Sequence, residues 1–141
     1  MSTVLWVHYF TDGRITSDQQ DLWAMYRYSD RLDSLCAKIG VRPLSEFHDT
    51  TDAEANLGPA PDESAGTFDA YVRMASRGKW FSPEEGLEII DRLLDALRQN
   101  PLRFGLLKDR YVEVMAELSA CRQAIDFARQ QRAKFNLCVV T

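Results

Sequence analysis

The alternation of hydrophobic and polar positions divides this chain into strand-like ends and a helical middle. Residues 3–10 and 135–140 are apolar and rich in β-branched and aromatic side chains, which is typical of mostly buried strands. Between them, apolar residues recur at helical spacing in three long stretches. We therefore expect a strand at each terminus and three main helices between the two strands.

The first helix is expected over residues 17–39, after a turn at Asp12-Gly13. Thr16 and Ser17 are both suitable N-caps, and Gly40 is a natural C-terminal stop. The apolar positions that repeat at helical spacing are Leu22, Met25, Tyr26, Leu32, Leu35, Cys36 and Ile39.

The second helix is expected to begin at Ser82 and to end near Asn100. Ser82 is suited to accept hydrogen bonds from the first free backbone amides, and Pro83 fits the first helical position. Glu85 is spaced to reach back to the cap, as in a capping box.

A third and longest helix is predicted after Gly105. Its apolar residues alternate steps of four and three over three heptads, as in a helix–helix contact inside a bundle and also in a coiled-coil seam. A seam would join two copies of the chain, so a structural homodimer is one alternative to a monomer. This heptad face consists of Leu107, Tyr111, Val114, Leu118, Cys121, Ile125 and Ala128.

The segment between the first two helices is polar and interrupted by prolines and glycines. We expect a short apolar turn at 44–47, a loop at about 50–65 and a brief helix at 67–76. Two strands alone form a marginal sheet, so the helices must cover it or a third strand lies within 41–80. Residues 1–141 then form a single α+β domain, with three helices packed on a small sheet that includes both terminal strands.

The net charge of −4 is unevenly distributed. Residues 1–71 carry twelve acids against five bases, whereas residues 72–141 carry nine acids against twelve bases. Residues 44–69 contain seven acids and no lysine or arginine. Overall acidity argues against nucleic acid as the main ligand, because that affinity comes largely from neutralised phosphates. Local acidity favours a partner with a basic surface.

Several classes of protein are disfavoured by composition. No apolar run approaches the roughly 20 residues that span a bilayer, and the apolar N-terminus lacks the basic lead-in of a signal peptide. Cys36, Cys121 and Cys138 are too widely spaced for a disulfide framework or a zinc ribbon. We expect a cytoplasmic protein with three reduced core thiols, no cofactor and no membrane contact. The sequence has neither a GxSxG nor a GxGxxG motif, so a binding protein is a simpler interpretation than an enzyme.

The leading hypothesis is a protein-binding module with an acidic surface. An outward-facing acidic loop at about 48–66 would speed the encounter with a basic partner, because charge acts mainly on association rate and specificity. Trp80 has no packing partner that the pattern assigns, so it is the expected exposed anchor. The surface consists of Glu46, Asp49, Asp52, Glu54, Asp62, Glu63 and Trp80. A basic run on the last helix is expected to be solvated or to pair with this loop; it consists of Arg122, Arg129, Arg132 and Lys134.

An alternative is a small metal-dependent or acid–base enzyme centred on His48. Asp49 and Asp52 stand close to His48 in sequence, and Asp12 follows the first strand, where it would approach if the loop folds back. Histidine and carboxylates ligate divalent metals and act as general bases. In the other interpretation the two aspartates cap a turn and His48 is solvated.

Two stretches resemble uncharacterised small bacterial proteins, namely Pro43-Leu44-Ser45-Glu46-Phe47-His48-Asp49 and Trp80-Phe81-Ser82-Pro83-Glu84-Glu85-Gly86-Leu87. Some small proteins of this general kind are encoded beside secreted toxins and act as immunity proteins. The resemblance implies that the chain neutralises a toxin by covering its active site. The matching motifs are structural, so the resemblance assigns no functional residue.

Overall fold

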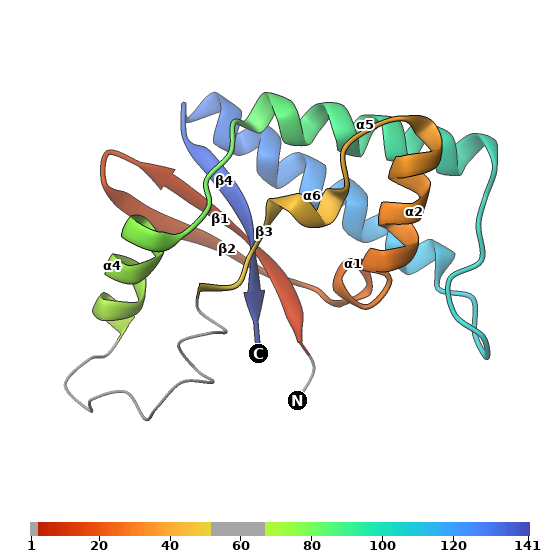
Figure 1. The fold of residues 1–141 in the computed structure, drawn as a ribbon, viewed down its shortest axis with the longest axis horizontal. Coiled ribbons are helices and arrows are strands. Elements are labelled where there is room, and N and C mark those ends of the chain that lie inside the picture. The colour runs from red at the N-terminus through yellow and green to blue at the C-terminus, as the bar shows by residue number, and fades with distance from the viewer. Residues whose placement is uncertain (1–2, 52–66) are drawn as a thin grey trace.

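The centre of the fold is a four-stranded sheet with strand order β2-β1-β4-β3 (Figure 1). The structure is a computed structural model that describes residues 3–51 and 67–141, with side chains for 3–51 and 72–141. β1 pairs antiparallel with both β2 and β4, and β3 pairs parallel with β4. The terminal strands therefore pair with each other, which confirms that prediction. The strands are β1 (Val4–Thr11), β2 (Arg14–Leu22), β3 (His48–Asp49) and β4 (Lys134–Val140).

Helices cover both faces of the sheet, and the mixed α+β fold is confirmed. α5 and α6 run side by side over one face, whereas α4 lies on the opposite side of the sheet (Figure 1). The helices are α1 (Trp23–Arg27), α2 (Ser29–Ile39), α4 (Thr67–Arg77), α5 (Pro83–Gln99) and α6 (Tyr111–Gln130), with a 3-10 helix η1 (Leu44–Phe47). The predicted turn at 44–47 and brief helix at 67–76 correspond to η1 and α4.

The two faces of the sheet are distinguished by alternating side chains, because successive residues of a strand point to opposite sides. Tyr9 packs edge-on against Phe127 of α6, with ring centroids 5.5 Å apart, so it marks the helix face. Phe10 points the other way and stacks on Trp80, with centroids 5.0 Å apart. We call that side the second face.

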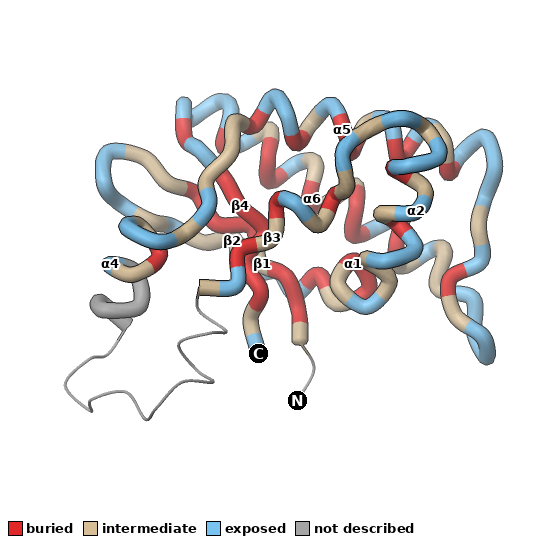
Figure 2. Tube along the Cα trace, viewed as in Figure 1, coloured by how far each residue is buried: buried red, intermediate tan, exposed pale blue. Residues whose placement is uncertain are grey.

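The hydrophobic core lies between the helix face and the helices α2, α5 and α6 (Figure 2). Three phenylalanine rings meet there: Phe47 is 5.0 Å from Phe81 and 5.4 Å from Phe135, between ring centroids. Gly86 of α5 lies directly against this cluster, and a Cβ added to it would stand 2.4 Å from Cζ of Phe135. Only a glycine lets α5 approach the rings this closely.

Replacing Gly86 by alanine is expected to lower the free energy of unfolding by roughly 1–2 kcal/mol, because overpacking costs typically 1–3 kcal/mol and the better helix propensity of alanine returns up to about 1 kcal/mol. Phe135 is fully buried and cannot move aside. Urea denaturation measures the change. Glu88→Ala, at an exposed position of the same helix, is the control and should be nearly neutral. An unchanged or higher stability of Gly86→Ala would show that the rings rearrange freely.

The predicted first helix over 17–39 is wrong in its first part. Residues 14–22 form β2, and the helical residues that follow are split into α1 and α2. Asp12 and Gly13 both have positive φ, at 51° and 75°, as in the tight turn that closes a two-residue β-hairpin. Residues 16–21 carry only polar side chains, so no apolar stripe favours a helix there.

α5 begins and ends as predicted, but the capping box does not form. Ser82 occupies the N-cap position and makes no side-chain capping hydrogen bond. The carboxylate of Glu85 turns instead toward Arg42, with 3.6 Å between Oε2 and Nη1. The carboxylate of Glu85, which was expected to bond to the N-cap backbone, therefore interacts with the guanidinium of Arg42.

The heptad face of the last helix packs inside the molecule. Val114, Leu118, Cys121 and Ile125 are buried in the core, and Leu107 precedes the helix, which begins at Tyr111. The face is therefore not available to a second copy, and a homodimer through this seam is not compatible with the fold. The three cysteines are buried, as expected.

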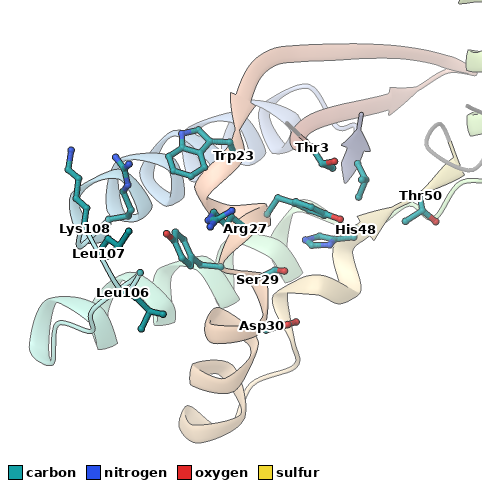
Figure 3. Close-up of a pocket in the computed structure, with 15 residues that line it drawn as sticks. Thr3, Trp23, Arg27, Ser29, Asp30, His48, Thr50, Leu106, Leu107 and Lys108 are labelled. Carbon is teal, nitrogen blue, oxygen red and sulfur yellow. The ribbon is translucent and has the colours of Figure 1, made fainter. Parts of the chain in front are cut away.

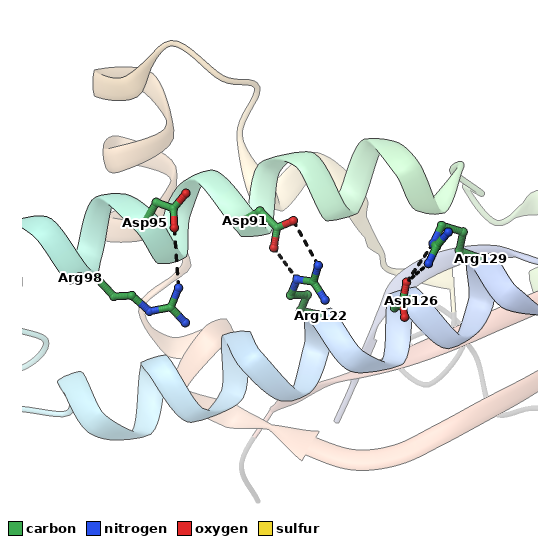
Figure 4. A network of polar contacts seen from close by, with 6 residues as sticks. All are labelled: Asp91, Asp95, Arg98, Arg122, Asp126 and Arg129. Carbon is green, nitrogen blue, oxygen red and sulfur yellow. Dashed lines mark hydrogen bonds and ion pairs between the residues drawn. The ribbon is translucent and has the colours of Figure 1, made fainter.

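Charged side chains of α5 and α6 form ion pairs within and between these two helices. Arg122 of α6 bonds to Asp91 of α5, and Arg129 bonds to Asp126 one turn before it (Figure 4). Asp95 and Arg98 form a third pair, within α5. Two members of the basic run, Arg122 and Arg129, thus serve contacts within and between these two helices, whereas Arg132 and Lys134 follow α6 and are exposed.

Candidate functional site

The described members of the predicted acidic surface do not face outward unpaired. Glu46 accepts a hydrogen bond from Nε of Arg42 at 2.8 Å. Asp49 is only 3% exposed, and its Oδ1 accepts from the hydroxyl of Thr51 at 2.8 Å and from the backbone N–H of Lys79 at 3.3 Å. The remaining acids, Asp52, Glu54, Asp62 and Glu63, lie outside the described residues, so their assignment stays a prediction.

Trp80 is not the exposed anchor that the sequence suggested. Its ring stacks on Phe10, and its Nε1–H donates to the carbonyl of Met74 at 3.1 Å. Both ends of the indole are therefore used within the fold, where Trp80 fastens the end of α4 to the second face.

His48 and Asp49 point to opposite faces of the sheet, because they are successive residues of β3. His48 lies beside Tyr26, with ring centroids 6.2 Å apart, whereas Asp49 lies on the second face. Cys138 of β4 is in register with both Asp49 of β3 and Trp6 of β1. Asp12 lies at the hairpin turn, six residues beyond Trp6 in sequence. At about 3.3 Å per residue this places Asp12 roughly 20 Å away. The predicted set His48, Asp49 and Asp12 is not brought together, and Asp52 lies outside the described residues.

Within residues 3–51 and 67–141, no group of three or more histidine, cysteine, aspartate or glutamate side chains is arranged to hold a metal ion. The metal-dependent version of the alternative function therefore gains no support from this part of the chain.

A row of polar side chains crosses the second face; His8, Asp49 and Asn136 are buried, and Ser17 is half-buried. His8 of β1 is directly opposite Ser17 of β2 and Asn136 of β4, and Asp49 follows on β3. Asn136 donates through Nδ2 to the carbonyl of Lys79 at 2.9 Å. Several buried atoms of the row have no hydrogen-bond partner in the described chain, namely both ring nitrogens of His8, Ser17 Oγ, Asp49 Oδ2 and Asn136 Oδ1. A buried polar atom without a hydrogen-bond partner lowers the stability of the fold. The stability of this face therefore depends on its hydration and on the charge of the row.

Burial lowers the pKa of His8 to about 4, although the nearby carboxylate of Asp49 acts in the opposite direction. His8 is therefore neutral at pH 7.

A groove of about 1350 Å³ lies next to α1. In Figure 3, residues 106–108 line one wall, and His48 and Thr50 line the other. Trp23 and Arg27 of α1 lie between the walls. The groove thus joins three parts of the chain that are far apart in sequence.

One wall of the groove is a loop whose backbone is held by internal hydrogen bonds. We call residues 103–110 the leucine loop. Oδ1 of Asp109 accepts from the backbone N–H of Phe104 and of Tyr111, both at 3.0 Å. Gly105 has φ +105°, and a Cβ there would stand 2.6 Å from the carbonyl oxygen of Lys108. The loop therefore has a defined shape.

The tip of the leucine loop exposes two adjacent leucines. Leu106 and Leu107 have 97% and 102% of their reference area in contact with solvent. Their side chains make no contribution to the core, although the loop that carries them is fixed to it through Phe104, which is fully buried. The structure thus exposes two apolar side chains on a loop that is anchored to the core.

Cations surround this apolar tip. Arg27, Arg31, Arg103 and Lys108 form no ion pair with any described carboxylate. Arg103 instead donates to the carbonyls of Gly105 and Leu106, at 3.0 and 3.1 Å. The guanidinium of Arg103 is thereby fixed at the loop.

Arg110 is already engaged. Its guanidinium lies 5.5 Å from the ring centroid of Trp23, and Nη1 is 3.3 Å from Oε1 of Glu113. Asp30 is the one carboxylate among the described residues that line the groove. Burial lowers the pKa of His48, so His48 is neutral at pH 7 and does not change the sign of the groove. The groove is therefore basic.

Sequence reasoning missed this site for an identifiable reason. Leu107 was assigned to the heptad face, because its spacing to Tyr111 and Val114 is helical. Pro101 and Gly105 were a signal that the helix begins later. Leucines left outside both flanking helices would then have indicated an exposed apolar loop.

Among the described helices, none is both long enough and apolar enough to cross a membrane. Comparisons with models of known protein families, with curated proteins and with solved structures found no match to this chain.

Proposed function

We propose that this chain is a protein-binding module, and that it binds through the basic groove and the leucine loop. The observation that carries the proposal is the full exposure of Leu106 and Leu107 on a loop of fixed shape. Contiguous apolar surface held in solvent is typical of interaction sites. A fixed loop also loses little conformational entropy on binding.

The shape of the site favours a protein over a membrane surface. The leucines stand beside a groove, not on a flat face, and the groove suits a convex segment of a partner (Figure 3). Trp23, Tyr26 and Tyr28 line it with large amphipathic rings, which are enriched at protein interfaces. The apolar tip would enter a pocket of the partner while the partner's own segment fills the groove.

The double variant Leu106→Ser/Leu107→Ser is expected to weaken partner binding at least tenfold. Burying a leucine side chain contributes about 1.5–3 kcal/mol, and 1.4 kcal/mol corresponds to a factor of ten. The experiment captures proteins from the source cell on immobilised wild type and on the variant, identifies those lost on the variant, and measures the affinity of the purified partner by calorimetry.

Val112→Ser is the matched control, because Val112 is also an exposed apolar residue, at 74%, but does not line the groove. It should bind the partner like wild type. Equal binding by the double variant would contradict the proposal. So would binding of wild type to phosphatidylglycerol vesicles but to no protein.

The toxin-neutralising role implied by the resemblance remains a proposal for the kind of partner. It is supported only by the binding site described above and by the small size of the chain. Expression of the identified partner in a susceptible cell, with and without this chain, tests it. Growth that is inhibited by the partner and restored by wild type, but not by the Leu106→Ser/Leu107→Ser variant, is the expected result.

A further inference from the structure

We infer that the partner contributes an acidic segment to the groove, in contrast to the basic partner that the sequence alone favoured. This inference rests on the proposed function, since it concerns the same surface. It concerns the charge of the occupant, whereas the proposed function concerns the apolar contact.

The first observation is the positive charge at the groove. Arg27 and Lys108 line the groove, and Arg31 and Arg103 lie beside it; none of the four forms an ion pair with a described carboxylate. Backbone hydrogen bonds lower the pKa of Asp109 and of Glu113, and the charges of Arg103 and Lys108, respectively, lower each pKa further from a longer distance. By contrast, Arg42, Arg98, Arg122 and Arg129 each pair with a carboxylate elsewhere on the surface. Other described cations, such as Arg14, Lys38 and Lys134, also form no ion pair with a described carboxylate, so lack of a partner alone does not distinguish the groove. What distinguishes it is the excess of positive charge in its described lining, where Arg27, Lys108 and Arg110 stand against one carboxylate, Asp30.

The second observation is the placement of rings beneath these cations. The guanidinium carbon of Arg27 is 5.9 Å from the ring centroid of Tyr28, and that of Arg31 is 5.8 Å from the ring centroid of Phe104. Contact with an aromatic ring limits where a long side chain moves. The positions of the two guanidinium groups are thus partly restricted before a partner binds. Both groups can still donate two hydrogen bonds to one carboxylate.

A peptide carboxylate suits this arrangement better than the other polyanions do. A nucleic acid would need a basic track along its phosphates, whereas the cations here surround one groove and the molecule as a whole is acidic. A membrane would meet the exposed leucines but would leave the groove unfilled. An acidic segment next to an apolar pocket matches both the groove and the leucine loop.

The test measures binding of a fluorescein-labelled deca-glutamate peptide by anisotropy at low and physiological salt. Wild type should bind it, more weakly as salt increases, because exposed charges are screened. The double variant Arg27→Glu/Lys108→Glu should bind it at least tenfold more weakly. The matched control Arg14→Glu/Lys134→Glu has the same change in net charge at two exposed positions near the hairpin end of the sheet, and it should bind like wild type.

Deca-lysine, a single-stranded oligonucleotide and phosphatidylglycerol vesicles are the competing probes. The inference is overturned if deca-lysine binds more tightly than deca-glutamate, if either of the other polyanions binds more tightly, or if the two charge-reversal variants behave alike. The proposed function would survive each of these results provided that Leu106→Ser/Leu107→Ser still loses the purified partner. Conversely, deca-glutamate binding that depends on Arg27 and Lys108, with partner binding unaffected by the serine variant, would retain the charged site and remove the apolar one.

Discussion

Replacing Glu117 by alanine is expected to lower the free energy of unfolding by about 3 kcal/mol, since each buried donor left without its partner costs about 1–3 kcal/mol. Glu117 lies on α6, yet its two carboxylate oxygens accept from the backbone N–H groups of Ala24 and Met25, at 3.2 and 3.0 Å. These are free amides of the first turn of α1, and no side chain of α1 or of its N-cap residue Leu22 satisfies them. Glu117 is thus a cap supplied from a distant helix.

Urea denaturation at pH 7 measures this loss, and the 1H–15N resonances of Ala24 and Met25 report whether α1 frays. Glu113→Ala removes another carboxylate from α6, one that forms a partly exposed ion pair with Arg110, and it should lower the free energy of unfolding much less than Glu117→Ala does. Equal losses in the two variants would show that Glu117 stabilises α1 no more than a surface ion pair does. Because α1 also forms the groove through Trp23 and Arg27, Glu117→Ala should weaken partner binding as well.

Acidification from pH 7 to pH 4 is expected to remove up to about 3 kcal/mol of stability through His8, since one pKa unit corresponds to about 1.4 kcal/mol. Burial lowers the pKa of His8 from 6.5 to about 4 in the folded protein. The folded state therefore favours the neutral ring. The stabilisation is complete above pH 6.5 and is lost as the pH falls from 6.5 toward 4. Neither ring nitrogen has a hydrogen-bond partner among the described residues, so a charged ring would leave two buried N–H donors unsatisfied there.

His8→Gln removes this titration and should flatten the dependence of the free energy of unfolding on pH between 6.5 and 4. Glu117 acts with the opposite sign, because burial raises its pKa and the folded state gains stability as that carboxyl is protonated. The comparison of wild type with His8→Gln cancels this contribution. An NMR titration of the His8 ring locates its pKa directly. A midpoint near 6.5, or the same pH dependence in both proteins, would show that His8 is exposed to solvent.

The elements that could be predicted from the sequence are those whose signal is local. The helix after Ser82 was placed correctly because Pro83 and an unbroken apolar stripe occur together. The strands at the termini were recognised by composition, and their pairing was expected because a strand at each end with helices between them favours a single small sheet. Residues 14–22 were misassigned because their polar sequence carries little periodicity, and only pairing with β1 makes them a strand.

The candidate site was predicted less well than the fold. Adjacent residues were grouped into one cluster, but the alternation along β3 sends His48 into the groove and Asp49 to the second face. His8 was not among the candidate residues predicted from the sequence, although the sheet brings it next to Ser17 and Asn136. Residues that become neighbours only through strand pairing leave no local pattern in the sequence.

By itself, the sequence determined the two terminal strands and the long helices after Ser82 and Gly105, because turn residues, prolines and periodicity act over a few residues. It also determined the uneven distribution of charge. The tertiary structure alone decided which charged groups are paired or buried within the fold and which stay accessible to a partner. Glu46 is neutralised by Arg42 and Asp49 is buried, whereas Arg27 and Lys108 are left around a groove. The physical reason is that pairing and burial depend on distances between segments far apart in sequence, and the packing of the core sets those distances.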